Sequence, residues 1–99
     1  MAKYDVYYAK ADKTLLVDCQ ADMLEILDTR VVVPLLPIAN APKPARYLNP
    51  LIHLGGETFV MATQFFASVS VRDLGDKFAT LSDRSDEVNR AIDTLITGF

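Results

Sequence analysis

Two residues of this chain, His53 and Cys19, have side chains that commonly carry acid–base, nucleophilic or metal chemistry. His53 is the only histidine, so a Ser-His-Asp or Cys-His arrangement needs it, and the sequence has no G-x-S-x-G motif to supply a nucleophile. One histidine and one distant cysteine cannot provide the three or four ligands of a zinc site. The ordinary interpretation of His53 is a hydrogen-bonded or half-exposed strand residue. We therefore expect no catalytic residues, no metal and no cofactor.

Three aspartates, Asp18, Asp22 and Asp28, are the other candidates for chemistry. They could form a carboxylate pair for proton transfer or hold Mg²⁺. Aspartate after a strand more often makes a turn or caps a helix, and we favour that interpretation. Cys19 shares one face of its strand with apolar neighbours, which is typical of a small buried hydrophobic residue rather than a reactive thiolate.

The composition is that of one soluble globular domain over residues 1–99. The chain is 51% hydrophobic and 23% charged, which fits a small core that self-association would help to stabilise. The net charge of −3 disfavours direct nucleic-acid binding by the chain alone. One cysteine excludes an intrachain disulfide, and the sequence shows no signal-peptide core or membrane span. We expect a cytoplasmic protein without membrane contact.

The elements that would position these residues are mostly short strands. Residues 4–8 and residues 15–19 both alternate at period two, and we expect them to form a hairpin. Residues 31–36 are apolar on both faces, as in a central strand, although Pro34 lacks an N–H. A bulge or an unpaired position is therefore expected at Pro34.

Further strands follow a proline-rich surface loop at residues 40–46. Residues 51–54 and 57–61 flank a Gly-Gly pair, which predicts a second hairpin. Residues 68–71 are predicted to form a sixth short strand, after which residues 74–76 turn the chain. Many short strands at close spacing indicate an antiparallel barrel or a strongly bent sheet.

The last part of the sequence changes to a helical period. Apolar residues recur there at three- and four-residue steps: Val88, Ala91, Ile92, Leu95, Ile96 and Phe99. We expect one amphipathic helix whose first N–H groups are capped by Ser82 or Ser85 and which Gly98 ends. The predicted fold class is mainly β with one C-terminal α-helix.

Five segments of the chain occur in a recognisable order. They are VDCQAD at 17–22, TRVVVPL at 29–35, HLGG at 53–56, ASV at 67–69 and AIDTLITGF at 91–99. Together they span nearly the whole chain and resemble the CcdB family of bacterial toxins. The resemblance implies an SH3-like antiparallel barrel with a small extra sheet, forming a homodimer.

The resemblance also implies a function. Toxins of this kind are not enzymes: they bind the A subunit of DNA gyrase and trap the complex in which DNA is cut. A CcdA-like antitoxin neutralises them with a disordered segment that folds on binding, and toxin and antitoxin are expected to share transcriptional control. The resemblance places the gyrase-binding surface at six positions: Thr97, Gly98, Phe99, Asp93, Met23 and Leu24.

Thr97 departs from the family, because it stands where tryptophan is typical, and the chain contains no tryptophan. Two functions stay open: an intact gyrase poison, and a weakened or non-toxic homologue that acts as an antitoxin-binding protein. A small nuclease is disfavoured, because the sequence offers no general base near a basic groove. Phe99 could instead close the core or a dimer seam, and Asp93 could be a simple solvated charge. Met23 and Leu24 could be interior residues of a short helical turn.

Overall fold

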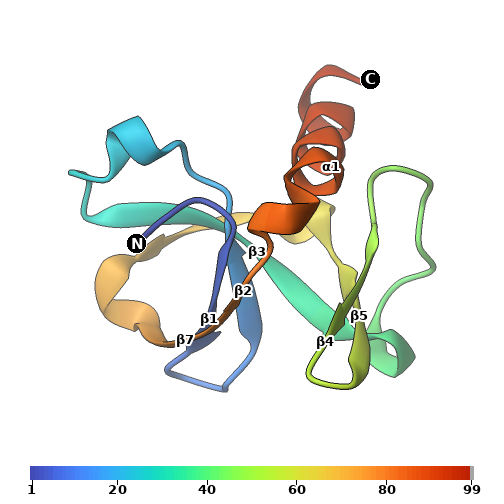
Figure 1. The fold of residues 1–99 in the computed structure, drawn as a ribbon, viewed down its shortest axis with the longest axis horizontal. Coiled ribbons are helices and arrows are strands. Elements are labelled where there is room, and N and C mark those ends of the chain that lie inside the picture. Colours follow the sequence, from blue (N-terminus) through green and yellow to red (C-terminus); the bar gives the residue numbers. More distant parts are fainter. Residues whose placement is uncertain (99) are drawn as a thin grey trace.

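Within residues 1–98, seven antiparallel strands form one curled sheet, and one α-helix stands beside it (Figure 1). The computed structural model describes residues 1–98. The main path of the sheet has the order β4-β5-β3-β2-β1-β7, and β6 pairs with β3 beside that path. The mainly β fold class with one C-terminal helix is confirmed. The elements are β1 (Asp5–Ala9), β2 (Leu15–Asp18), β3 (Thr29–Pro37), β4 (Leu51–Leu54), β5 (Glu57–Met61), β6 (Ala67–Ser70), β7 (Leu74–Thr80) and α1 (Ser85–Thr97).

The sheet is a curled half-barrel rather than a closed barrel. Within residues 1–98, its path ends at β4 on one side and β7 on the other, and no ladder joins these two strands. The curl still brings them close, because a Cβ atom added to Gly55 in the β4–β5 turn would lie 3.2 Å from the ring of Phe78 in β7. The small extra sheet that the resemblance implied is not separate, since β6 pairs with residues 29–32 of β3.

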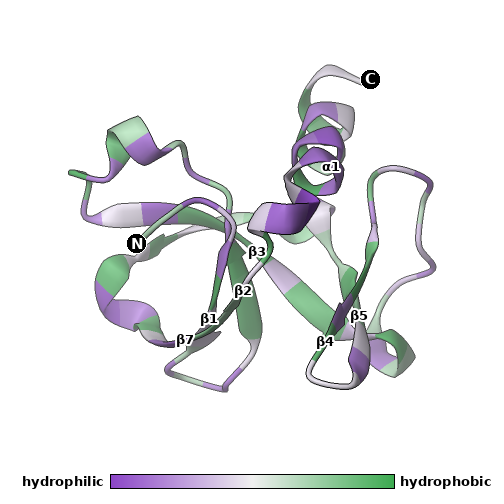
Figure 2. Cartoon of the chain, viewed as in Figure 1, coloured by the Kyte–Doolittle hydropathy of each residue, from purple (hydrophilic) through white to green (hydrophobic). Residues whose placement is uncertain are grey.

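Alternate residues of the strands build the core, as the period-two pattern predicted. Val6 in β1 and Val17 in β2 are fully buried and pair directly across the two strands. Tyr4, Tyr8 and Cys19 pack against the same cluster. The predicted first hairpin is therefore confirmed. β3 does not alternate in this way, and Figure 2 shows hydrophobic stretches along most of its length.

β3 is the central strand, and its proline falls where its partner changes. Residues 29–32 pair with β6, and residues 35–37 pair with β5. Pro34 lies in the gap between these ladders, where its carbonyl accepts a hydrogen bond from the Ala62 N–H at 2.9 Å. The nitrogen and carbonyl of a strand residue face the same neighbouring strand, so the missing N–H faces this gap. The structure thus has the unpaired position expected at Pro34.

The prediction that residues 74–76 turn the chain is wrong. Residues 74–80 form β7, which pairs antiparallel with β1, and the turn comes earlier, in the 3-10 helix Val71–Asp73. Gly75 does not have a positive φ. A Cβ atom added to it would lie 3.1 Å from the Tyr8 carbonyl oxygen. Gly75 therefore marks a close approach of two strands rather than a turn.

α1 packs through its first half and is exposed toward its end. Val88 and Ala91 are fully buried in the core, whereas Ile96 is 66% exposed. Gly98 ends the helix in the left-handed conformation (φ 83°), and its N–H donates to two carbonyls of the preceding turn. The amphipathic helix and its glycine stop are confirmed. Within residues 1–98 no helix is long and apolar enough to cross a membrane.

The start of α1 differs from the prediction. No side-chain oxygen accepts a hydrogen bond from the first turn, so the expected caps at Ser82 and Ser85 are wrong. The reason is the 3-10 helix Ser82–Arg84, which runs directly into α1 and places Arg84 at the cap position. Asp86 and Glu87 in the first turn still place negative charge at the positive end of the helix dipole.

Candidate partner-binding surface

The residues best suited to catalysis make structural interactions instead. His53 in β4 is exposed, and its Nδ1 lies 2.9 Å from Thr58 Oγ1 on the paired strand β5. Burial raises the pKa of the Cys19 thiol to about 12, and the Asp18 charge adds to the rise. The thiol is therefore protonated at neutral pH. Within residues 1–98 no group of three or more His, Cys, Asp or Glu residues could hold a metal ion.

Asp18 pairs with an arginine rather than with another carboxylate. Its Oδ2 lies 2.7 Å from Arg30 Nη2 and accepts a hydrogen bond from Arg30 Nε at 2.8 Å, and both side chains are buried. Burial raises the pKa of the Asp18 carboxyl, against the opposing effects of the Gln20 N–H and the Arg30 guanidinium. Asp22 Oδ1 accepts a hydrogen bond from the Lys3 N–H at 2.7 Å. Asp18 and Asp22 thus hold structure, in line with the favoured interpretation, whereas no sequence pattern pointed to Arg30.

The Asp18–Arg30 pair belongs to a network that anchors the loop between β2 and β3. The Gln20 N–H donates to Asp18 Oδ1 at 3.0 Å, and Gln20 Oε1 accepts from the Val31 N–H at 3.1 Å. Gln20 Nε2 donates to the Leu24 carbonyl at 3.0 Å. One side chain therefore ties both ends of the loop together and fixes its base.

Four large apolar side chains are exposed on this loop and form what we call the apolar loop. Met23 and Leu24, in the 3-10 helix Asp22–Leu24, are 85% and 44% exposed, and Ile26 and Leu27 are 87% and 46% exposed. The alternative that Met23 and Leu24 are interior residues is wrong. Sequence reasoning missed Ile26 and Leu27, although their place in the short run DMLEILD, beside the two predicted residues, was an available signal.

The end of α1 is the second region at which site residues were expected. Asp93, Thr97 and Gly98 are exposed, and Thr97 Oγ1 donates to the Asp93 carbonyl at 2.7 Å. Phe99 lies outside the described residues. In Figure 1 the apolar loop and the end of α1 stand well apart, so a single chain does not bring the two regions together.

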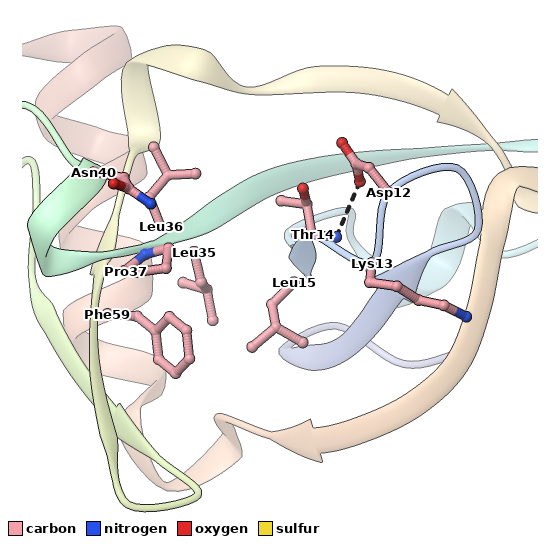
Figure 3. Close-up of a pocket in the computed structure, with 9 residues that line it drawn as sticks. All are labelled: Asp12, Lys13, Thr14, Leu15, Leu35, Leu36, Pro37, Asn40 and Phe59. Atoms are coloured by element: carbon pink, nitrogen blue, oxygen red, sulfur yellow. Dashed lines mark hydrogen bonds between the residues drawn. The ribbon is translucent and has the colours of Figure 1, made fainter.

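A groove of about 290 Å³ lies between the β1–β2 turn and the middle of the sheet. Leu15, Leu35 and Phe59 turn their side chains toward the same space on one side of it (Figure 3). Asp12 stands on the other side, and its Oδ1 accepts a hydrogen bond from the Thr14 N–H at 3.0 Å. No sequence pattern pointed to this groove.

A comparison with known families matches the chain over almost its whole length. The family model described as CcdB protein matches residues 3–98. The chain belongs to the CcdB family. The resemblance inferred from five short segments is thereby confirmed, and membership of the CcdB family supports the role of a toxin.

Two solved structures share the fold of this CcdB-family chain. One is an endoribonuclease in complex with its cognate antitoxin from a Mycobacterial species, with a TM-score of 0.74 and 13% identity over 95% of this chain and 92% of that chain. The other is an endoribonuclease from a Mycobacterial species, with a TM-score of 0.76 and 13% identity over 95% of this chain and 88% of that chain. At this identity the likeness concerns the fold alone.

Proposed function

We propose that this CcdB-family protein is the toxin of a type II toxin–antitoxin module, which binds the A subunit of DNA gyrase and traps the cleaved DNA–gyrase complex. The observation that carries the proposal is the apolar loop, with four large apolar side chains on a base fixed by Gln20. Exposed apolar clusters on soluble proteins mark protein–protein contact sites. A loop anchored at its base loses little conformational freedom on binding, which favours affinity.

The gyrase contact is assigned to both regions described above. The apolar loop contributes Met23 and Leu24, and the structure adds Ile26 and Leu27 beside them. The end of α1 contributes Asp93, Thr97, Gly98 and Phe99. Gly98 supports this assignment, because its left-handed conformation directs the backbone away from the helix axis.

Binding rather than catalysis is the proposed mode of action, so the protein is a gyrase poison and not an enzyme. His53 is engaged by Thr58 on the neighbouring strand, and the raised pKa of Cys19 keeps its thiol out of the nucleophilic form. His53 also lies away from the apolar loop, because β5 separates its strand β4 from β3 in the sheet order. A gyrase partner requires a cytoplasmic location.

A CcdA-like antitoxin is the proposed second partner. A flexible segment that folds on binding loses conformational entropy, so it needs apolar contacts that offset this cost. The groove offers such contacts at Leu36 and Pro37, which are only partly buried or exposed, with Asp12 and Lys13 at its rim to orient a polar backbone. The structural neighbour solved with its cognate antitoxin adds support at the level of the fold.

A second candidate function is favoured by one residue. Thr97 is exposed and hydrogen-bonds back to its own helix, so it offers no aromatic anchor at the end of α1. An aromatic anchor in an interface is often worth about 2 kcal/mol or more. The chain could therefore bind the antitoxin while poisoning gyrase weakly.

Expression in bacteria with sensitive and with resistant gyrase tests the proposal. We expect killing only of the sensitive strain, and we expect Met23→Ser and removal of Gly98 and Phe99 to abolish it without lowering the melting temperature. Ile38→Ser is the matched control, because Ile38 is also an exposed apolar residue but lies outside both regions. It should kill like the unchanged chain.

The outcomes separate the candidate functions. Equal killing of both strains would contradict gyrase as the target. No killing, together with tight binding of the protein encoded upstream of the toxin gene, would favour the weakened homologue. If the truncated chain loses killing and thermal stability together, Phe99 belongs to the core or a dimer seam and not to the gyrase contact.

A further inference from the structure

A cluster of two arginines and one tyrosine joins the loop before β4 to α1 and is used by neither region described above. The Arg90 guanidinium lies over the Tyr47 ring, 3.5 Å from its centroid, and the Arg46 guanidinium lies over the same ring at 4.7 Å. Among residues 1–98 neither arginine has a carboxylate within ion-pair distance. Stacking fixes a guanidinium while leaving its N–H edge free to donate.

Hydrogen bonds from two polar side chains hold the backbone on both sides of Tyr47 in place. The buried Asn49 donates from Nδ2 to the Met61 carbonyl at 3.0 Å, and its Oδ1 accepts from the Ala45 N–H at 3.0 Å. Thr63 Oγ1 donates to the Leu48 carbonyl. Tyr47 itself has a φ of 66°, a conformation that is rare for a bulky side chain, and its side chain is 41% exposed. Such strain is maintained only by surrounding contacts, and it concentrates at functional sites.

A pocket of about 320 Å³ opens beside the Tyr47 ring and the guanidinium groups stacked on it. It is lined by Tyr47, Pro50, Glu87 and Arg90. Glu87 is the one carboxylate in this lining, and Arg84 lies 3.7 Å from it. The pocket therefore combines an apolar floor with a cation whose donor edge is free.

The position of Arg90 connects this pocket to the rest of α1. Asp93 and Thr97 follow Arg90 by three and seven residues, so all three lie along one face of the helix. A partner seated in the pocket is thus placed to continue along the exposed end of α1.

We propose that this pocket binds an acidic side chain of a polypeptide partner, with its carboxylate accepting hydrogen bonds from Arg90 and its aliphatic part packed between Tyr47 and Pro50. Tyrosine and arginine are, with tryptophan, the residue types enriched among those that dominate binding at protein interfaces. The proposal does not depend on gyrase being the target, because none of the residues that line the pocket is assigned to the gyrase contact.

A peptide is favoured over a nucleic acid by the charges around the pocket. Arg46, Arg84 and Arg90 supply positive charge, but Glu87 stands in the pocket wall and Asp86 is exposed on the neighbouring turn. A single carboxylate can contact Arg90 while the rest of the peptide brings no further negative charge close to Glu87. A nucleic acid carries a negative charge at every phosphate, so its neighbouring phosphates would be repelled by Glu87. The net charge of −3 adds to this preference.

The test is an NMR titration of the whole ¹⁵N-labelled chain with a capped peptide of alternating Glu and Ala and with its Gln counterpart. We expect saturable shifts of the amide signals around Tyr47 and Arg90 with the Glu peptide and none with the Gln peptide. Arg90→Gln and Tyr47→Leu should each weaken binding about fivefold. Arg72→Gln is the charge-matched control, because Arg72 is exposed in the turn before β7. It should bind like the unchanged chain.

Three results would overturn the proposal. The first is the absence of any saturable shift with the Glu peptide at millimolar concentration. The second is equal affinity of the Arg90→Gln and Arg72→Gln variants, provided that thermal unfolding shows both to be folded. The third is a single-stranded RNA oligonucleotide that shifts the same amides when the Glu peptide does not. Killing of gyrase-sensitive bacteria is measured separately, so failure here leaves the proposed function intact.

Discussion

The Asp18–Arg30 pair carries two opposite charges in the interior, with side chains 0% and 1% exposed. Removing each charge from water costs several kcal/mol, and mutual attraction offsets this cost only while both partners are present. Nη1 of Arg30 has no hydrogen-bond partner in the described part of the chain, so the pair is not fully satisfied. Its contribution to stability therefore depends on both residues being kept.

We predict that Arg30→Met lowers the free energy of unfolding by about 3–5 kcal/mol, because Asp18 is then a buried charge without its partner. Urea unfolding followed by circular dichroism measures this change. Arg72→Met removes an exposed arginine and should change the same quantity by less than about 0.5 kcal/mol. Similar losses for the two variants would contradict the prediction.

Cys19 lowers the free energy of unfolding at alkaline pH. The pKa of its thiol is about 12 in the folded chain against an ordinary value of 9.0, so the folded state holds the proton more tightly. This contribution is fully present below pH 9 and is lost as the pH rises toward 12. We predict a decline in the free energy of unfolding of at most about 4 kcal/mol over this range. Cys19→Ala should decline less in parallel denaturant titrations, and an equal decline would show that other groups cause it.

At the scale of elements, the end of α1 offers a direct gain-of-function test. We predict that Thr97→Trp raises affinity for the A subunit of gyrase by tenfold or more, because it adds an aromatic side chain at an exposed contact position. Binding to the purified subunit measures the effect. Ile96→Trp is the matched control, since it places the same side chain about 100° around the helix. Equal gains in affinity for both variants would indicate non-specific hydrophobic binding and not a specific contact.

The elements that sequence patterns predicted correctly have local causes. The Gly55–Gly56 turn needs only two residues with positive φ, observed at 59° and 81°, and α1 needs only its apolar period. β7 was missed because Gly75 resembles a turn residue, and its role depends on the backbone of β1, which is distant in sequence. Pairing between distant strands leaves no short-range signal.

The residues of the candidate site also divide into those with a local sequence signal and those without one. Met23, Leu24 and the end of α1 were accessible through the resemblance, because they lie in continuous segments. Arg30 was not, since its partner Asp18 comes from another strand. The stacking of Arg90 on Tyr47 was also not predictable, because it joins a loop to a helix more than forty positions later in the printed sequence.

At the scale of the whole molecule, we predict a homodimer. Large apolar side chains remain exposed on several elements, including Phe65, Phe66 and Ile96, and a chain of this size has a small core. A second copy would bury part of this surface and stabilise the fold by mass action. Sedimentation at micromolar concentration should give about twice 11.0 kDa. A monomer at that concentration would contradict the prediction.

We expect electrostatic attraction to guide the antitoxin segment to this chain and apolar contacts to hold it there. We predict a large negative heat-capacity change when a synthetic antitoxin segment binds, because a folding segment must bury extensive apolar surface. Titration calorimetry at several temperatures measures it. Leu36→Ser in the groove should reduce the change, because Leu36 lines the groove and is only partly buried. A heat-capacity change near zero for the unchanged chain would rule out this mode of binding.

The place of β1 between β2 and β7 sets an order of assembly during translation. The β1–β2 hairpin can form as soon as residue 18 has left the ribosome, but the other edge of β1 stays open until residues 74–80 emerge. The hydrogen bond that Tyr4 Oη donates to Asn89 in α1, at 3.1 Å, can form only after residue 89 has emerged. Open strand edges pair readily with other chains, so the nascent protein is most prone to aggregation in this interval. A low concentration or a bound partner protein would prevent such pairing. The surface proposed to poison gyrase is completed last, which leaves an antitoxin already present in the cell time to meet each new molecule before it is active.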